Sequence, residues 1–543
     1  MQHPFAITLD VGTSLANHTG SWRNERPVYV DRLPPCNAAC PAGENIQDWL
    51  FHAEAGNYEA AWRSLVEHNP LPAIMGRVCY HPCEGACNRA QIDAAVGINA
   101  VENFLGDLAL KKGWAFDTPT RETAKRILVV GAGPSGLSAA YHLRRMGHTV
   151  EIHEAGPMAG GMMRFGIPKY RLPRDVLDGE VKRILDMGVT LELNQKVTDI
   201  LWAMHEGSFD AAFLAVGAHI AKRAYIPAGE ASKILDAVSV LHSMEGREKP
   251  LLGRRVVVYG GGNTALDVAR TAKRLGAEEA IIVYRRTREK MPAHDFEVEE
   301  ALEEGVLMKW LSTITQVAEG VITVEKMALN EKGFPQPTGE FESLEADSVV
   351  LALGQDVDLS LLEGVPGIDV KNRVVQVDMN MMTGSKGVFA GGDMVPSERT
   401  VTVAVGHGKK AARNIDAWLR GSSYAPPPRN ELAGFDKLNT WYYGDAPKTM
   451  RPTLEIARRV STFEEVTGGL DETNALYEAR RCLSCGNCFE CDNCYGVCPD
   501  NAVIKLGSGK RFRFNYDYCK GCGLCAAECP CGAIRMVPEA IHS

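Results

Sequence analysis

The distribution of cysteine is the feature that most limits how this chain can fold. Of its 16 cysteines, five lie between Cys36 and Cys87, eleven lie between Cys482 and Cys531, and the long central segment has none. In a reducing compartment, cysteines clustered in this way indicate metal sites rather than disulfide bonds. We therefore expect metal-binding modules towards both ends of the chain and a different kind of domain between them.

The C-terminal cysteines include two copies of the spacing C-x2-C-x2-C-x3-C-P. This motif binds [4Fe-4S] clusters in two-cluster ferredoxins, where the fourth cysteine of each run ligates the other cluster. One predicted cluster therefore has the ligands Cys488, Cys491, Cys494 and Cys529. The other has the ligands Cys519, Cys522, Cys525 and Cys498. A purely structural role is the alternative, but the paired spacing favours electron transfer in an α+β ferredoxin-like domain.

The central segment begins with a pattern typical of a dinucleotide-binding fold. An apolar run that starts at Arg126 leads into GAGPSG, and a helical pattern follows. Gly131 permits a tight turn, Gly133 lets the backbone approach a pyrophosphate, and Gly136 lets the helix pack closely on the strand. Glu154 ends the next predicted strand, where a carboxylate can accept hydrogen bonds from an adenosine ribose. The alternative is a merely structural glycine-rich turn, which the order of strand, helix and acidic residue disfavours.

A second copy of this pattern follows, with Gly260, Gly262 and Ala265 at G-x-G-x-x-A spacing. Its second strand ends in Arg285 and Arg286 instead of an acid. Guanidinium groups at this point suit the 2′-phosphate of NADP(H), so NADP(H) is favoured over NAD(H). The alternative is a solvated basic loop, because charges after a strand are common.

Two later apolar runs, which begin at Asp347 and Gly387, end in glycines and indicate buried strands. Asp393 closes the second run, where a carboxylate can bind the ribityl chain of a flavin, and the helix after it can direct its positive end at the flavin ring. We therefore expect two α/β Rossmann-like domains, the second inserted in the first, that pass a hydride between a nicotinamide and FAD. Because residues 88–481 contain no cysteine, the chain lacks the C-x-x-C pair that a flavoprotein disulfide reductase needs.

Two longer stretches resemble the small subunit of bacterial glutamate synthase. The flavin site of that family is similar to GAGPSGLSAAYHLRRMGHTVEIHEAGPMAGGMMRFGIPKYRLP, and its NADPH site is similar to GGGNTALDVARTAKRLGA with VYRRTREKMPA. Dihydropyrimidine dehydrogenase and the large subunit of NADH-dependent ferredoxin:NADP oxidoreductase share this module, which covers roughly residues 33–420 here. The resemblance implies that FAD is bound by Gly131, Gly133, Gly136, Glu154, Gly161, Arg164 and Asp393. It implies that NADPH is bound by Gly262, Asn263, Thr264, Arg285 and Arg286.

The N-terminal cysteines form a further candidate metal site. Cys79, Cys83 and Cys87 are each separated by three residues, so a turn and a short helix can aim them together with Cys40. A zinc ion is one candidate for four such thiolates. The resemblance instead assigns these positions to a [4Fe-4S] cluster, which would exchange electrons with the flavin.

The cysteines left over raise the question of a fourth cluster. The family normally has a second N-terminal cluster, but this sequence has VYVDRLPP where its first C-x-x-C pair would stand. The resemblance leaves Cys36 and Glu102 as half of that site. Cys482 and Cys485, in EARRCLSCG, resemble the missing pair, and we hypothesise that they fold back to complete a site with Cys36 and Glu102. The alternative is that these thiols are free or buried, and the chain then binds three clusters instead of four.

These patterns predict a multidomain chain: a helical Fe-S N-terminal domain, two Rossmann-like domains, and a ferredoxin-like domain that follows a linker with prolines and small polar residues. The helical domain is expected over residues 1–120 and the NAD(P)H-binding domain over 246–384. The two parts of the FAD-binding domain are expected over 121–245 and 385–420. The linker and the ferredoxin-like domain follow at 421–478 and 479–543.

Composition and charge restrict the partners. The net charge of −9 and the isoelectric point near 5.9 argue against a nucleic-acid or polybasic membrane surface. No apolar run approaches the ~20 residues needed to cross a bilayer. The N-terminal residues lack the basic start and apolar core of a signal peptide, so we expect a cytoplasmic protein.

We expect an NADPH-dependent FAD/iron–sulfur electron-transfer subunit that works with redox partner subunits, in a hetero-oligomeric complex, or with ferredoxin. No side chain is expected to be an indispensable catalytic acid or base, because the cofactors carry the chemistry. The preferred partner is a 2-oxoacid:ferredoxin oxidoreductase, since a fused ferredoxin module suits low-potential electrons. The alternatives are a glutamate synthase small subunit, a stand-alone NAD(P)H:ferredoxin oxidoreductase and, in another class, a redox-sensing or scaffold protein without turnover.

Overall fold

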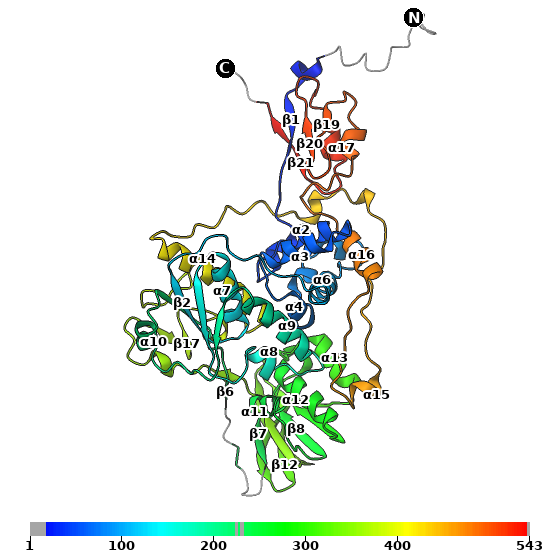
Figure 1. Ribbon diagram of the computed structural model, residues 1–543. Coiled ribbons are helices and arrows are strands. Elements are labelled where there is room, and N and C mark those ends of the chain that lie inside the picture. Colours follow the sequence, from blue (N-terminus) through cyan, green and yellow to red (C-terminus); the bar gives the residue numbers. More distant parts are fainter. Residues whose placement is uncertain (1–17, 223–225, 228–232, 540–543) are drawn as a thin grey trace, which may run out of the picture.

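The computed structural model describes residues 18–222, 226–227 and 233–539. Residues 1–17, on which the signal-peptide expectation bears, lie outside these ranges. The molecule is elongated, with a small β module at one end, a helical domain in the middle, and two α/β domains beyond it (Figure 1). The multidomain architecture predicted from the sequence is confirmed.

The helical domain is formed by helices whose apolar faces share one core. The helices are α1 (Pro35–Ala39), α2 (Ile46–Glu54), α3 (Tyr58–Val66), α4 (Pro72–Val78), α5 (Pro82–Gly85) and α6 (Ile98–Lys112). Trp49, Trp62 and Leu105 are fully buried in this core. α4 and α6 pack very closely, because a Cβ at Gly106 would lie 2.3 Å from the backbone nitrogen of Ala73.

The first α/β domain contains a parallel five-stranded sheet in the order β18-β5-β2-β3-β4. Its strands are β2 (Arg126–Val130), β3 (Thr149–His153), β4 (Thr190–Glu192), β5 (Ala211–Leu214) and β18 (Val388–Ala390). Its helices are α7 (Pro134–Arg145), α8 (Met162–Phe165), α9 (Arg174–Leu185), α10 (Ile200–Glu206) and α14 (Val401–Leu419). β2 is buried from Ile127 to Val130, as expected for the centre of a parallel sheet.

The second α/β domain is inserted between β5 and β18. Its parallel sheet has the order β10-β9-β8-β14-β7, and an antiparallel sheet of β11, β12 and β13 packs beside it. Its strands are β7 (Ile234–Asp236), β8 (Arg255–Tyr259), β9 (Glu279–Val283), β10 (Leu307–Lys309), β11 (Ser312–Ala318), β12 (Val321–Leu329), β13 (Pro335–Glu345) and β14 (Ser348–Leu351). Its helices are α11 (Ala237–Ser243), α12 (Asn263–Arg274) and α13 (Asp295–Glu303). The short strands β6 (Ile220–Ala221) and β15 (Gln355–Asp356) pair where the chain crosses between the two domains.

The boundaries of the inserted domain differ from those expected. Its sheet already includes Ile234, which precedes the predicted boundary at residue 246. Val357 and Met381 lie in the core of the first domain, although they fall within the predicted range 246–384. The inserted domain therefore extends from β7 to β14, because hydrophobic packing rather than the spacing of motifs defines its limits.

The C-terminal module is completed by residues from near the start of the chain. β1 (Glu25–Tyr29) pairs antiparallel with β21 (Ile534–Pro538). The rings of Tyr29 and Phe514 stack with their centroids 4.8 Å apart. The expected boundary of the helical domain, 1–120, is therefore corrected, because β1 belongs to the ferredoxin-like module (Figure 1). The other elements of this module are α17 (Asn493–Gly496), β19 (Val503–Lys505), β20 (Phe512–Phe514) and α18 (Leu524–Ala527).

Residues 421–478, predicted to be a linker, instead contain α15 (Ile456–Arg459) and most of α16 (Glu472–Arg480), which pack on other domains (Figure 1). In α15, the buried guanidinium of Arg459 donates to Glu304 of the inserted domain at 3.2 Å. α16 packs on α2, and Glu478 accepts a hydrogen bond from the backbone N–H of Gly97 at 2.8 Å. This segment therefore holds the domains together by packing.

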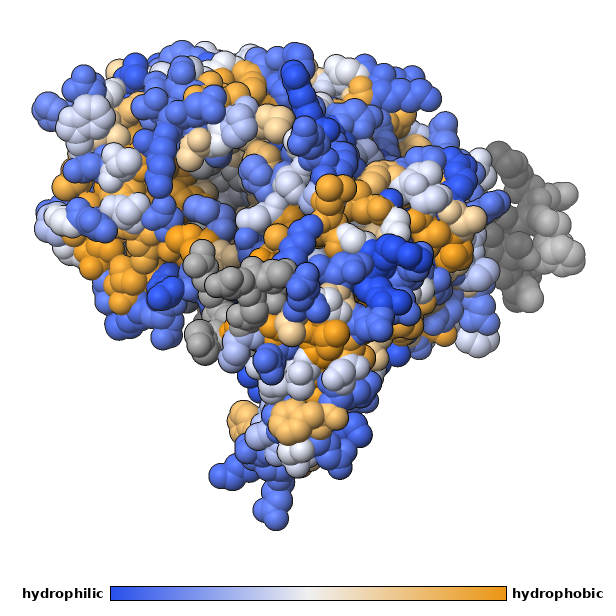
Figure 2. Space-filling view, turned by 90° about the horizontal axis from the view of Figure 1, so that it is seen from below, coloured by the Kyte–Doolittle hydropathy of each residue, from blue (hydrophilic) through white to orange (hydrophobic). Residues whose placement is uncertain are grey.

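The end of the molecule formed by the α/β domains has hydrophobic patches interrupted by hydrophilic residues (Figure 2). Leu251 and Phe341 of the inserted domain are among its exposed apolar side chains, with 83% and 61% exposure. In the part of the chain that the structure describes, no helix combines the length and the apolar character needed to cross a membrane.

Candidate functional site

The first glycine-rich turn, between β2 and α7, has space for a dinucleotide. Gly131 has φ +105°, and a Cβ there would lie 2.5 Å from the carbonyl oxygen of Ala215. A Cβ at Gly136 would lie 2.0 Å from the carbonyl oxygen of Gly131, so α7 can approach the strand only with glycine here. A Cβ at Gly133 would instead meet open space, with Gly161 the nearest neighbour at 3.9 Å. The cradle therefore fits the pyrophosphate of FAD.

The Glu154 carboxylate at the end of β3 turns back towards this loop. It accepts hydrogen bonds of 2.8 Å from the backbone N–H groups of Ala132 and Gly156. These bonds fix the carboxylate beside the glycine turn, where a ribose would be recognised.

Asp393 and Arg164, two of the predicted FAD ligands, differ in how far protein groups already engage their side chains. Burial raises the pKa of the Asp393 carboxyl, and the charge of Arg399 opposes that effect. Arg164 is buried and donates to the carbonyl oxygen of Ala159 at 2.6 Å, and it also pairs with Asp178. Asp393 is thus the freer of the two to contact a flavin, while Arg164 braces the loop.

Ser135 is a candidate that the sequence analysis missed. Its hydroxyl is buried in the first turn of α7 and has no hydrogen-bond partner among the described residues. A Cβ at Gly392 would lie 3.1 Å from the Cβ of Ser135, so the hydroxyl lies close to the loop that carries Asp393. A polar atom buried without a partner is costly unless a ligand satisfies it. The only signal in the sequence was its position between Pro134 and Gly136.

The second glycine-rich turn, between β8 and α12, has the same form. Gly260 has φ +149°, and space is open around a Cβ at Gly262. Thr264 is half-buried in the first turn of α12. The Asn263 amide donates to the hydroxyl of Tyr80 at 2.5 Å and so also contacts the helical domain.

The arginines after β9 differ in how far they are already paired. Arg285 is exposed, and the described residues supply no ion-pair partner for it. Arg286 is half-buried, with its Nε hydrogen-bonded to no atom of the described chain. Arg288 pairs with Glu299 at 3.2 Å. Arg285 and Arg286 therefore have donors left for an anionic group.

The N-terminal thiols separate into two groups. The first, which we call the flavin-side group, consists of Cys40, Cys79, Cys83 and Glu102. Burial raises the pKa of each of its thiols, and the charge of Glu102 adds to this effect in all three. The hydroxyl of Thr402, in the first turn of α14, donates to Sγ of Cys79 at 3.1 Å, and the backbone N–H of His81 donates to it at 3.2 Å. This group therefore adjoins the helix that faces the flavin cradle.

The second group, which we call the junction group, consists of Cys36, Cys87, Cys482 and Cys485. All four line one small cavity between the helical domain and the loop that follows α16. The charges of the other three thiols reinforce burial in raising the pKa of Cys36. In the structure, two residues therefore lie in the opposite group from the one predicted from the sequence. Cys87 lies with Cys36, and Glu102 lies with Cys79, because α5 ends at Gly85 and the extended backbone at Cys87 turns that thiol away.

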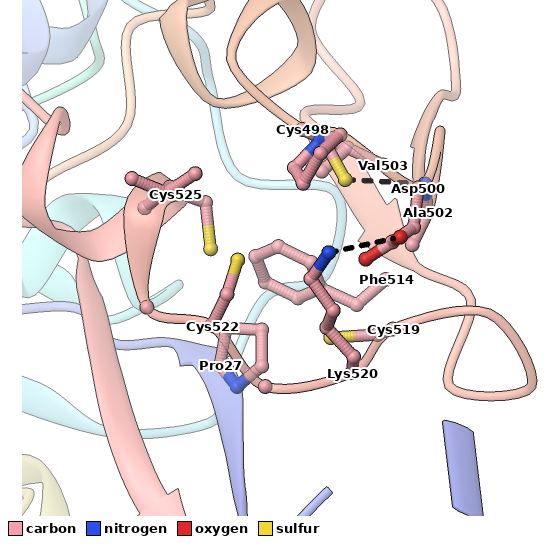
Figure 3. Close-up of a pocket in the computed structure, with 14 residues that line it drawn as sticks. Pro27, Cys498, Asp500, Ala502, Val503, Phe514, Cys519, Lys520, Cys522 and Cys525 are labelled. Atoms are coloured by element: carbon pink, nitrogen blue, oxygen red, sulfur yellow. Dashed lines mark hydrogen bonds and ion pairs between the residues drawn. The ribbon is translucent and has the colours of Figure 1, made fainter. Parts of the chain in front are cut away.

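The ferredoxin-like module gathers its thiols in two further groups. Figure 3 shows Cys498 on the same pocket as Cys519, Cys522 and Cys525. The backbone N–H of Ala502 donates to Sγ of Cys498 at 3.2 Å. Cys529 is instead near the other run, where its charge raises the pKa of three thiols, those of Cys488, Cys491 and Cys494. The fourth cysteine of each run therefore lies beside the other run. Within the described residues, no group of three or more His, Cys, Asp or Glu side chains is arranged to hold a single metal ion.

Comparisons with known families agree with this geometry. Residues 125–408 match the pyridine nucleotide-disulphide oxidoreductase family, and they contain no cysteine. Residues 24–114 match the 4Fe-4S cluster domain II of dihydropyrimidine dehydrogenase, which sets aside the zinc alternative for this segment. Residues 487–533 match the 4Fe-4S dicluster domain.

Three curated proteins illustrate the range of relatives. The beta subunit of an NADP(+)-dependent formate dehydrogenase from Moorella thermoacetica is 37% identical, over 83% of this chain and 70% of its own length. The beta subunit of an NADPH-Fe(3+) oxidoreductase from Geobacter sulfurreducens is 34% identical, over 84% of this chain and 76% of its own length. The small chain of glutamate synthase [NADPH] from Escherichia coli is 32% identical, over 71% of this chain and 89% of its own length.

Proposed function

Because the chain belongs to the pyridine nucleotide-disulphide oxidoreductase family and carries 4Fe-4S domains on both sides of that region, we propose that it is the NADP(H)-binding electron-transfer subunit of a larger complex. It is an NAD(P)H-dependent flavin/iron–sulfur oxidoreductase subunit, and two of its relatives are named as beta subunits of NADP(+)- or NADPH-dependent enzymes. One observation carries the electron-transfer role. Thr402, at the start of the helix that faces the flavin cradle, donates a hydrogen bond to Cys79 of the flavin-side group.

The residues of the chain hold and orient the cofactors. The glycine turn at Gly131 and Gly133, with Ser135 and Asp393, would hold FAD. When bound, FAD would accept two electrons as a hydride from NADPH and pass them on one at a time to [4Fe-4S] clusters. The thiols of the flavin-side group and of the two ferredoxin groups would hold those clusters. The hydrogen bond from Thr402 to Cys79 would tune the reduction potential of a cluster held by the flavin-side group.

Contacts between domains hold the inserted domain against the flavin-side group. The Tyr80 ring, next to Cys79 in the chain, stacks on His294 with centroids 3.6 Å apart. The Tyr80 hydroxyl accepts the hydrogen bond from Asn263, and the backbone N–H of His294 donates to the same amide at 3.2 Å. These contacts support hydride transfer, because they connect the NADP(H) turn with the segment that carries an electron acceptor.

The free guanidinium donors after β9 support NADP(H) over NAD(H). Arg285 and Arg286 stand where the strand ends, and neither is used up by a carboxylate of the described chain. A 2′-phosphate would accept their hydrogen bonds, whereas the 2′-hydroxyl of NAD(H) offers no charge.

The partner that we propose is an oxidoreductase subunit that oxidises a small organic acid. Formate is the first candidate substrate, because the Moorella relative is named for formate dehydrogenase and matches most of this chain. A 2-oxoacid:ferredoxin oxidoreductase is the second candidate, since the ferredoxin-like module suits its low-potential electrons. A glutamate synthase partner is disfavoured, because the small chain matches only 71% of this chain.

Affinity purification of the tagged protein from its own organism under anaerobic conditions tests this proposal. The purified complex is assayed for NADP+ reduction with formate, with pyruvate plus coenzyme A, and with glutamate. We expect reduction with one of the two organic acids and a co-purified subunit that carries the oxidising site. Failure of the isolated chain to oxidise NADPH with a one-electron dye would replace the proposal by the redox-sensing alternative.

A further inference from the structure

We infer that the junction group binds a fourth [4Fe-4S] cluster, which joins the two ends of the chain in one electron path. The inference rests on the proposed electron-transfer function and adds the point where electrons pass between the N-terminal and C-terminal modules. The four thiols come from α1, from the start of the 3-10 turn η3 (Asn88–Gln91), and from the loop after α16. Segments almost 450 residues apart thus supply thiols to one cavity.

The cavity has the surroundings of a thiolate site. All four thiols are free, and none is engaged in a disulfide. Apolar side chains, among them Leu50 and Ile98, line much of the remaining wall, together with the polar residues Gln47, Asn88 and Arg89. The amide of Asn88 donates to Sγ of Cys485 at 3.4 Å, and the backbone N–H of Ser484 donates to Sγ of Cys482 at 3.4 Å. Donors aimed at sulfur favour the deprotonated thiolate, which is the form that ligates iron.

Buried ionic contacts hold the loop after α16 in this position. Arg481 is only 2% exposed and donates to the carbonyl oxygens of Ala94 at 2.6 Å and Ala95 at 3.0 Å. It also forms a 2.9 Å ion pair with Glu478, whose side chain is fully buried. Since Ala94 and Ala95 follow Cys87 closely in the chain, these contacts place the loop directly relative to that thiol. A buried arginine is costly to desolvate, so its use here points to precise placement of the loop.

The loop itself has a backbone conformation that is rare for its residues. Ser484, between the two cysteines, has φ +49° and is buried. A side chain with a Cβ rarely adopts this left-handed backbone conformation, because its Cβ crowds the neighbouring carbonyl oxygen. Gly486 follows with φ +75°, and a Cβ there would lie 2.4 Å from the Cβ of Arg32. Strain of this kind persists at functional sites, and here it directs both cysteines into one cavity.

Short stretches of chain connect the junction group with a neighbouring group on each side. Cys36 and Cys40 lie four residues apart along and just beyond α1, a rise of about 6 Å. Cys485 and Cys488 are separated by only two residues, which allows at most about 11 Å between their Cα atoms. The backbone N–H of Gly486 donates to the carbonyl oxygen of Cys531 at 2.6 Å, which ties the loop to the ferredoxin-like module. The junction group therefore lies between the flavin-side group and the nearer ferredoxin group.

The four groups together leave one cysteine without an assignment. Cys531 is buried, and its Sγ lies 3.8 Å from that of Cys529. Because Cys531 lies outside the junction cavity, it provides a matched control for the loss of a buried thiol.

The test is the iron content of the full chain after anaerobic reconstitution, measured as iron per FAD. We expect about 16 iron atoms per FAD in the wild type, from four [4Fe-4S] clusters. The double variant C482S/C485S should contain about 12, and Cys531→Ala should keep about 16. Spin quantitation by electron paramagnetic resonance on the reduced samples should fall in parallel in the double variant alone.

A wild type with about 12 iron atoms per FAD, or a double variant that keeps about 16, would overturn the inference. FAD content and the melting temperature of each variant show whether it folds. If the double variant does not fold, Cys36→Ser, which changes the opposite end of the chain, must lose the same four iron atoms. Bleaching of wild-type FAD by NADPH is followed separately. Its absence would refute the proposed function, whereas a low iron count with normal bleaching would refute only the fourth cluster.

Discussion

The arginines after β9 allow the coenzyme preference to be tested residue by residue. Within the part of the chain that the structure describes, Arg285 is exposed without an ion-pair partner and Arg286 is half-buried with an Nε that makes no hydrogen bond. Arg288 is already paired with Glu299. We predict that Arg285→Gln and Arg286→Gln weaken the use of NADPH and leave the use of NADH nearly unchanged. Arg288→Gln is the matched control, because it removes the same charge from the same loop.

The magnitude follows from burial. A hydrogen bond to a charged partner contributes about 1.5–3 kcal/mol, and water competes more strongly at an exposed site. Arg285 should therefore contribute near the lower limit, which corresponds to about a tenfold decrease in kcat/KM for NADPH. Arg286 should contribute near the upper limit, which corresponds to a decrease of about 100-fold. The guanidinium of Arg288 is engaged by a carboxylate, so its removal should change kcat/KM by about twofold at most.

The assay is the steady-state reduction of a one-electron dye by NADPH and by NADH, at low and at moderate ionic strength. The ratio of kcat/KM for the two coenzymes is the quantity compared. A parallel loss with NADPH and NADH would mean that the arginines support the loop rather than read the 2′-phosphate. An effect of Arg288→Gln as large as that of Arg286→Gln would mean that general charge attraction, not a specific contact, sets the preference.

Three further predictions concern the cradle, the domain interface and one ferredoxin group. Gly136→Ala places a Cβ 2.0 Å from the carbonyl oxygen of Gly131, so the helix must move away from the strand. The purified variant should therefore contain little FAD, measured by its absorbance. A normal FAD content would contradict the close approach of helix and strand. Burial alone would raise the pKa of Glu304, but hydrogen bonds from two buried arginines lower it from 4.5 to about 2. Glu304→Gln should therefore lower the free energy of unfolding by about 3 kcal/mol at pH 7. The difference in melting temperature between the variant and the wild type should shrink as the pH falls from about 4.5 towards 2. A difference that does not depend on pH would refute this. The Tyr29 hydroxyl lies 3.3 Å from Sγ of Cys494. Tyr29→Phe should lower the reduction potential of the adjoining cluster by about 40 mV, measured in a redox titration followed by electron paramagnetic resonance. An unchanged potential would mean that the hydroxyl forms no hydrogen bond to the ligated sulfur.

The local patterns of the sequence were sufficient to predict the nucleotide folds and the ferredoxin-like module. A strand, a glycine turn and a helix are contiguous, so the spacing of Gly131, Gly133 and Gly136 already contains the geometry that the turn requires. The insertion of one α/β domain in the other was also predictable, because the strand that closes the first sheet appears only after the second glycine turn. The spacing of the ferredoxin cysteines likewise indicated that the fourth thiol of each run lies beside the other run.

The exact limits of the domains were not predictable in this way. Val357 and Met381 follow the inserted domain's last strand but pack in the core of the first domain. Their apolar character would suit either core, and only the path of the chain after β14 decides between them. Similarly, the prolines after residue 421 suggested a linker, whereas Arg459 and Glu478 make this segment part of the packed structure.

The sequence by itself determined which cysteines occur in short, regular runs, because ligand spacing within a turn or a helix is a local property of the backbone. Only the tertiary structure decided that Cys87 lies with Cys36, Cys482 and Cys485, and that Glu102 lies with the other N-terminal thiols. The reason is physical: α5 ends between Cys83 and Cys87, so equal spacing in the sequence leads to opposite directions in space. The contacts of Arg481 that bring the C-terminal loop to Cys87 depend on burial between segments almost 400 residues apart, which no local pattern encodes.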